Sequence, residues 1–232
     1  MVQTPTIPQV LYPDSDGQPM ADNTVQYRWI VRLVANLKQL LKDRTALVAG
    51  DLLWYPVKVE GPPVPSQAPD VMVVLGRPDC DRGSYKQWEE DNIAPQIVFE
   101  IISPSNTVAE MANKQQFYQQ HGVLEMYFYD PQSYNFWGFV RESQGHELSL
   151  MTALNLPWTS PLLQIRFELS EDGLAVFYPD GEPFKDFVEL AEALDQTQME
   201  LEQVQAERDR AQAERERAFT KLRELGLDPT TL

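Results

Sequence analysis

The sequence lacks several features that define common protein classes. Only one of its 232 residues, Cys80, is a cysteine, so no internal disulfide can form, which fits a reducing cytoplasm. No run of eighteen apolar residues is present, and the mean hydropathy of -0.39 agrees with the exclusion of a membrane-spanning protein. The first fifteen residues carry no Lys or Arg, unlike a secretory signal. We therefore expect a cytoplasmic protein that has no membrane partner.

Basic residues are also scarce. Nineteen Lys and Arg face thirty-five Asp and Glu, which gives a formal net charge of -16. This charge argues against non-specific binding to DNA or anionic membranes, but not against an enzyme that reaches DNA through metal ions and a local basic patch. The sequence has no glycine-rich phosphate loop, Cys/His cluster or nucleophile elbow. Any chemistry must therefore come from carboxylates and lysines.

The composition changes once along the chain. Residues 1–185 are rich in apolar residues, prolines and turns, and the 43% hydrophobic content of the whole chain is enough for a core. The next forty residues contain neither Pro nor Gly and are dominated by Glu, Gln, Arg, Ala and Leu. We predict a body at 1–185, a helical coiled-coil arm at 186–226 and a tail at 227–232.

A heptad period supports the coiled-coil interpretation of the arm. One core position takes Phe187, Leu194, Leu201, Arg208, Arg215 and Leu222, and the other takes Leu190, Thr197, Val204, Ala211, Ala218 and Leu225. A solvated surface helix would also explain this charge-rich stretch. The apolar residues at both ends of the seam favour pairing with another helix, most simply in a homodimer.

The body reads as two helices among several strands. An amphipathic helix follows the N-cap types at 22–24, and a capping box, Thr107 with Glu110, begins the second helix. The apolar stripe expected on that second helix is Val108, Met111, Ala112, Gln115 and Tyr118. Extended segments are predicted at 48–59, 70–75, 97–102, 125–130, 134–142, 148–154, 163–169 and 174–178. This order predicts an α/β fold with a central mixed sheet flanked by helices.

Three charged residues stand out in the body. Asp70 opens an apolar strand, and Glu100 is the one charge within the apolar run 97–102. Lys114 follows four residues after Glu110. Each has an ordinary explanation: a turn or cap for Asp70, an exposed end or salt bridge for Glu100, and a helical surface pair for Lys114 with Glu110.

Together the three residues fit a site for a hard cation. Two carboxylates on adjacent strands can bind Mg²⁺ through oxygen while waters complete its shell. The backbone carbonyl of Ile101 is a candidate for a further ligand. A nearby ammonium, here Lys114, would orient an attacking water or neutralise the charge that develops on a phosphodiester.

The same residues carry a family resemblance. The order of motifs resembles the Uma-type restriction endonucleases of bacteria, within the PD-(D/E)XK nuclease superfamily, over roughly residues 20–180. The matching segments are Pro69-Asp70, Glu100-Ile101-Ile102-Ser103-Pro104-Ser105, Lys114, Tyr118, Gly122-Val123-Leu124-Glu125-Met126-Tyr127 and Tyr129-Asp130-Pro131. The resemblance implies a restriction-endonuclease-like fold, DNA as substrate, and a Mg²⁺ or Mn²⁺ site at Asp70 and Glu100.

The sequence departs from the superfamily pattern at two places. Ile102 stands where the motif usually keeps its lysine, and the resemblance implies that Lys114 on the following helix takes that role. Many superfamily members use a glutamate on the first helix, where this chain offers Gln26. Asp22 and Asp51 are further candidates for that position.

Two functional hypotheses follow. The first is a metal-dependent DNA endonuclease that uses Asp70, Glu100 and Lys114. The second is a catalytically silent nuclease fold that acts as a binding module through its coiled coil. A glycosidase with paired carboxylates is a weaker third, because a lysine is not part of that machinery.

Overall fold

The computed structural model describes residues 11–17 and 19–224. Its contacts divide the chain into two compact units, Met1–Phe184 and Lys185–Leu232. The elements of the first unit are α1 (Thr24–Leu40), β1 (Ala46–Gly50), β2 (Trp54–Tyr55), β3 (Val71–Leu75), β4 (Tyr85–Lys86), η1 (Gln87–Glu89), β5 (Ile97–Ile101), α2 (Val108–Gln120), β6 (Glu125–Asp130), β7 (Asn135–Val140), β8 (Ser149–Thr152), η2 (Ala153–Asn155), β9 (Trp158–Thr159), β10 (Arg166–Ser170) and β11 (Gly173–Phe177). The second unit contains α3 (Phe187–Glu224).

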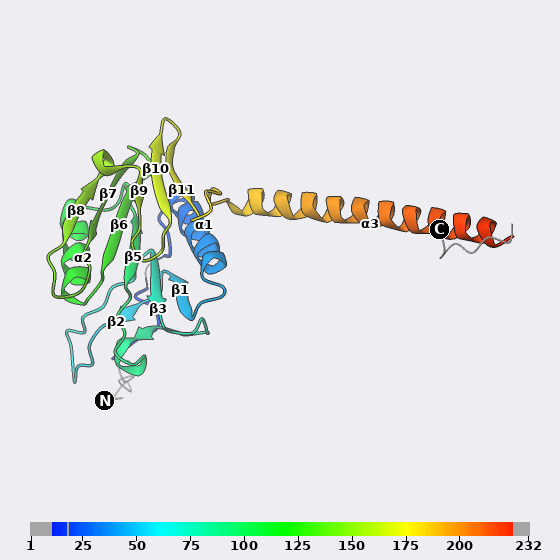
Figure 1. Ribbon diagram of the computed structural model, residues 1–232. Coiled ribbons are helices and arrows are strands. Elements are labelled where there is room, and N and C mark those ends of the chain that lie inside the picture. Colours follow the sequence, from blue (N-terminus) through cyan, green and yellow to red (C-terminus); the bar gives the residue numbers. More distant parts are fainter. Residues whose placement is uncertain (1–10, 18, 225–232) are drawn as a thin grey trace, which may run out of the picture. The chain divides into compact units, whose positions relative to one another are not determined.

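A six-stranded sheet forms the centre of the first unit (Figure 1). Its strand order is β1-β3-β5-β6-β7-β8, in which β5 and β6 are parallel and the other neighbours are antiparallel. The sheet is therefore mixed, as the sequence predicts. β5 lies between β3 and β6, so the residues at its end and at the start of β3 are neighbours.

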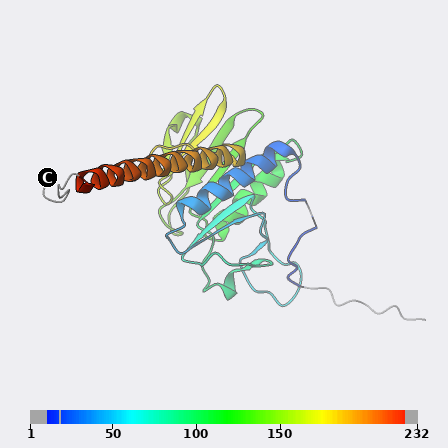
Figure 2. The same cartoon turned by 90° about the vertical axis from the view of Figure 1, so that its right-hand side faces the viewer.

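The two helices of the body cover opposite faces of this sheet (Figures 1 and 2). Side chains alternate along a strand, so odd-numbered residues of β3 and β5 face one way and even-numbered ones the other. Val71, Val73 and Phe99 pack in a cluster with the buried face of α1, while Met72 and Val98 pack in a cluster with α2. This alternation directs the side chain of each site residue.

The remaining strands form two small sheets. β11, β10 and β9 make an antiparallel sheet, whose Phe167, Leu174 and Val176 join the core on the α1 side. β2 and β4 form a short parallel pair, with Trp54 and Tyr85 in the core on the α2 side. The extended segments predicted at 48–59 and 163–169 are wrong in their bounds, since β1 ends at Gly50 and β10 begins at Arg166.

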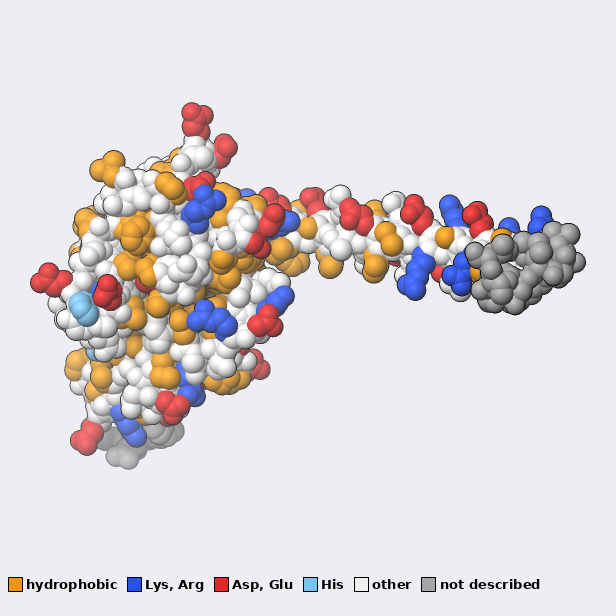
Figure 3. All heavy atoms as spheres, in the orientation of Figure 1, with side chains coloured by type: hydrophobic (Ala, Val, Ile, Leu, Met, Phe, Trp, Pro, Cys, Tyr) orange, Lys and Arg blue, Asp and Glu red, His pale blue; other side chains and the backbone are white. Residues whose placement is uncertain are grey.

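The second unit is one long helix. α3 has 38 residues, and among its described side chains the apolar residues of the seam are exposed, with Phe187 at 75%, Leu194 at 67% and Leu201 at 64%. Figure 3 shows apolar side chains at the surface of this helix, among charged ones. Leu225 and the tail at 227–232 lie outside the described residues. No helix in the described part of the chain is long and apolar enough to cross a membrane.

Candidate active site

Glu100 is directed at α2 by the alternation of β5. It shares the face of Val98, and its side chain is 2% exposed. Lys114 Nζ lies 2.7 Å from Glu100 Oε2, and the Tyr118 hydroxyl donates a hydrogen bond to Glu100 Oε1. Lys114 and Tyr118 are four residues apart, which places them on the same side of α2. One helix therefore contacts both oxygens of this carboxylate.

Asp70 lies directly before β3, beside the end of β5. Its Oδ2 accepts a hydrogen bond of 2.6 Å from the backbone N–H of Ile101 and one of 3.4 Å from Gln26 Nε2. Gln26 Nε2 also donates to the carbonyl of Ile101 at 3.0 Å. The backbone N–H of Asp22 donates to Gln26 Oε1 at 2.8 Å, which fixes the orientation of this amide. Gln26, near the start of α1, thus forms hydrogen bonds with residues at the start of β3 and at the end of β5.

The electrostatics of the site are set by burial and by the closeness of the two carboxylates. Burial, with the Glu100 carboxylate, raises the pKa of Asp70 from 3.8 to about 7. Burial alone would lower the pKa of Lys114, but Glu100 and Asp70 outweigh it and hold the pKa above its usual value. Burial and Glu100 also raise the pKa of Tyr118, so its hydroxyl stays protonated and donates. The Lys114 ammonium therefore forms a salt bridge with Glu100 and also attracts the Asp70 carboxylate.

A cleft of about 400 Å³ opens beside these residues. Its walls include Asp70, Lys114, Gln26, Asp22 and Asp51, so it brings five of the residues singled out in the sequence to one place. Asp51 follows β1 with a left-handed φ of 48°, and burial, with nearby Asp16, raises its pKa. Hydrogen bonds from Ser103 and Ser105 lower the pKa of Asp22. The rim of the cleft is therefore acidic apart from Lys114.

The donor set suits a hard divalent cation that keeps several waters. Among the described residues, no group of three or more His, Cys, Asp or Glu side chains could hold a metal ion. Asp70, Glu100 and the carbonyl of Ile101 nevertheless supply oxygen ligands of the kind Mg²⁺ prefers, and Mg²⁺ commonly uses only one or two protein carboxylates. Asp70 lines the cleft with Lys114, and the buried Glu100 contacts Lys114, so two carboxylates lie near a single ammonium at this site, which favours a cation.

The sequence predicts no functional role for Tyr118, although its spacing of four residues from Lys114 indicates a shared face of the helix. A surface pair between Lys114 and Glu110 is the alternative expected from the sequence, but the ammonium forms its salt bridge with Glu100. The apolar stripe predicted for α2 is wrong. Tyr118 is its one buried member, and Val108 is 89% exposed. α2 packs over the buried Glu100, so the side of the helix that faces the sheet carries the polar groups of Lys114 and Tyr118.

Comparison with protein-family models identifies the family of the chain. A family model named Uma2, whose description is "Putative restriction endonuclease", matches residues 14–176. The chain belongs to the Uma2 family. This match confirms the predicted resemblance and, with the mixed sheet and its flanking helices, the predicted fold class.

Other comparisons find little more. No curated protein matches this Uma2 chain. Among solved structures, it is similar to the crystal structure of a "putative nuclease belonging to DUF820" from Anabaena variabilis, with 15% sequence identity and a TM-score of 0.43. That match covers 63% of this chain and 76% of the other.

Proposed function

We propose that this Uma2 protein is a Mg²⁺- or Mn²⁺-dependent endonuclease that hydrolyses phosphodiester bonds of DNA. The observation that carries the proposal is the clustering of three residues beside one cleft: Asp70 and Lys114 line the cleft, and the buried Glu100 contacts Lys114. The family description supports a nuclease, and the shared burial of two carboxylates supports a divalent cation. Chemistry of this type needs an oxygen-ligand site next to a cationic group.

The residues of the site have distinct roles in this proposal. Asp70, Glu100 and the Ile101 carbonyl would hold the divalent cation. A cation held there would supply a coordinated water of lowered pKa and positive charge beside the phosphate. Lys114 lines the cleft and uses one N–H on Glu100, so its other protons can orient water or stabilise charge at phosphorus. Gln26 positions Asp70 and the Ile101 carbonyl by donating to both.

Cleavage and metal binding test the assignment together. Purified full-length protein with Mg²⁺ or Mn²⁺ should nick or cut plasmid DNA, and Asp70→Asn, Glu100→Gln and Lys114→Ala should each lose most of that activity. Calorimetry should show that the two carboxylate variants lose metal binding while Lys114→Ala keeps it. Glu110→Gln is the matched control, because it changes a carboxylate of the same helix and cleft outside the proposed ligands. Full activity in all three site variants would refute the assignment.

The exposed seam of α3 favours a second candidate function. Five apolar residues of the seam lie at the surface of the helix: Phe187, Leu190, Leu194, Leu201 and Val204. We propose that α3 pairs with a second copy of the chain. A catalytically silent Uma2 fold would act through this pairing alone, and it would bind no divalent cation at Glu100. The same calorimetry therefore separates the two functions.

A further inference from the structure

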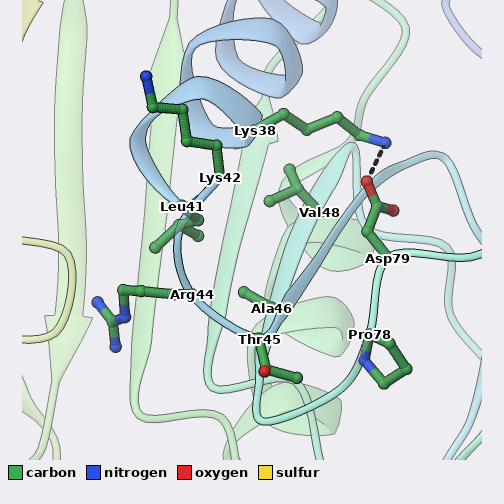
Figure 4. A pocket seen from close by; sticks show the side chains of 9 residues that line it. All are labelled: Lys38, Leu41, Lys42, Arg44, Thr45, Ala46, Val48, Pro78 and Asp79. Carbon is green, nitrogen blue, oxygen red and sulfur yellow. Dashed lines mark hydrogen bonds and ion pairs between the residues drawn. The ribbon is translucent and has the colours of Figure 1, made fainter.

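A second hollow lies at the far end of the helix and strand that border the active-site cleft. It measures about 420 Å³ and is bounded by the end of α1, the start of β1 and the loop after β3. Lys38, Lys42 and Arg44 line it, together with a single acidic residue, Asp79 (Figure 4). A concave surface with three cations and one anion is notable in a chain with a net charge of -16.

The cations of this hollow are largely available to a ligand. Lys38 Nζ lies 2.7 Å from Asp79 Oδ2, but both side chains are more than 40% exposed, and an ion pair so exposed contributes little free energy. Within the part of the chain that the structure describes, neither Lys42 nor Arg44 forms an ion pair. Figure 4 shows both side chains extending from the turn that follows α1.

α1 extends this positive character back toward the cleft. From residue 24 to residue 42 the sequence contains Arg28, Arg32, Lys38 and Lys42 and no acidic residue. The guanidinium of Arg32 donates a hydrogen bond to the carbonyl of Phe184, so it is less available to a ligand. Arg28 is exposed to solvent. The active-site rim has the opposite sign, since carboxylates surround Lys114 there. A polyanion that enters the acidic cleft therefore needs attraction from another surface.

The cleft and the hollow lie at opposite ends of α1 and β1. Gln26 near the start of α1 and Asp51 just after β1 line the cleft, while Lys38 and Ala46 at the other ends of the same elements line the hollow. From Gln26 to the end of α1 at Leu40 the helix rises about 21 Å. At 3.4 Å per base step, this length corresponds to about six steps along a DNA strand that runs parallel to α1.

We propose that the hollow lined by Lys38, Lys42 and Arg44 binds a backbone phosphate of duplex DNA about six base steps from the bond cleaved in the cleft. The inference rests on the proposed nuclease function and adds where the duplex lies. Each phosphate neutralised by Lys or Arg releases counterions, so contacts here supply sequence-independent affinity that the acidic cleft cannot. Phosphate contacts of this kind also fix the register of a duplex.

Duplex binding tests the proposal without relying on cleavage. A fluorescein-labelled 24-base-pair duplex is titrated with full-length protein in Ca²⁺, and anisotropy gives the affinity at several salt concentrations. The double substitution Lys42→Gln with Arg44→Gln should weaken binding about tenfold or more and reduce the slope of log K against log salt by roughly 1 to 2. Within the described residues neither side chain has an ion pair, so the melting temperature should change little.

Lys58→Gln with Lys86→Gln is the matched control, because it removes two positive charges that line neither surface. Equal weakening by both double variants, or no weakening by the first, would overturn the proposal. Inorganic phosphate serves as the second probe. If the wild-type protein binds phosphate but Lys42→Gln with Arg44→Gln leaves the duplex affinity unchanged, the proposal is likewise overturned. If wild-type protein binds and cleaves DNA but ignores these substitutions, only this inference fails. If wild-type protein binds no duplex, the nuclease proposal fails as well.

Discussion

Asp70 and Glu100 place two carboxylates beside one ammonium where water has little access. The first is 7% exposed and the second 2%. Desolvation of like charges is costly, and the protein reduces this cost by raising the pKa of Asp70 and by directing Lys114 and Tyr118 at Glu100. A divalent cation would remove the same cost by supplying positive charge. The arrangement is therefore sensitive to both protons and metal.

The first prediction concerns pH and stability without metal. The folded-state pKa of Asp70, about 7, exceeds its unfolded value of 3.8, so folding favours the protonated form. Its contribution to the free energy of unfolding is fully present below about pH 4 and is lost as pH rises through 7. Urea unfolding in EDTA should therefore show wild type losing a few kcal/mol relative to Asp70→Asn between pH 4 and 8. A pH-independent difference between the two proteins would contradict the assigned pKa.

The second prediction concerns Tyr118. Tyr118→Phe removes the donor to Glu100 Oε1, and we expect a cost of about 1–3 kcal/mol in stability. Because the glutamate loses its fixed orientation, kcat and Mg²⁺ affinity should fall while KM for DNA is unchanged. Tyr85→Phe is the control, since it removes another buried hydroxyl bond, to the carbonyl of Ile93, away from the site. Equal activity of the two variants would show that Tyr118 serves stability alone.

At this scale the sequence predicts chemistry better than contacts. Asp70, Glu100 and Lys114 could be found because a charge within or before an apolar strand is conspicuous. Gln26 is a sequence candidate on the first helix, and the spacing of Tyr118 from Lys114 indicates a shared face of α2, but the hydrogen bonds of both could not be predicted because they reach residues 18 to 75 positions away. Asp22 Oδ2 accepts hydrogen bonds from Ser103 and Ser105, and the role of Asp22 as a ligand stays a prediction.

Among the elements, α2 has the most direct effect on the site because it carries both groups that contact Glu100. Its start is fixed by a capping box in which Thr107 accepts from the backbone N–H of Glu110. We predict that Thr107→Ala costs about 1 kcal/mol. It should also reduce activity, because fraying of the first turn loosens the helix that holds Lys114. Urea denaturation and the cleavage assay measure both effects, with Thr152→Ala, in the cap of η2, as the control. Unchanged activity in Thr107→Ala would show that α2 is held by its packing alone.

Element boundaries were less predictable than element types. The face of α1 follows from its period, and Ile30, Leu33 and Leu37 are buried as expected. The strand expected at 48–59 ends early because Asp51 adopts a left-handed φ of 48°, which Asp tolerates and no local pattern announces. Gln164, with φ of 59°, likewise lies just before the delayed start of β10. The turn at Asp51 is also held by a distant contact, since its backbone N–H donates to the carbonyl of Asp70.

For the whole molecule, the arm is the feature most open to test. We predict that full-length protein dimerises through α3, because burial of its apolar seam would stabilise a helix pair. The truncation should follow Lys185, because Phe184 is 1% exposed and its carbonyl accepts a hydrogen bond from Arg32. Sedimentation equilibrium should give a dimer for the full chain and a folded monomer for 1–185. A monomeric full chain, or a dimeric truncation, would place the interface elsewhere.

Cys80 gives the protein a built-in attachment point for a probe. Its thiol is exposed and is the single cysteine of the chain, so a maleimide dye would react at one position without any engineered mutation. That position follows Asp79, the residue paired with Lys38 at the edge of the basic hollow. A dye attached there would sense the arrival of a nucleic acid at this end of α1, and its fluorescence could be followed in stopped flow. The rate at which the substrate reaches the hollow thus becomes measurable in the natural sequence.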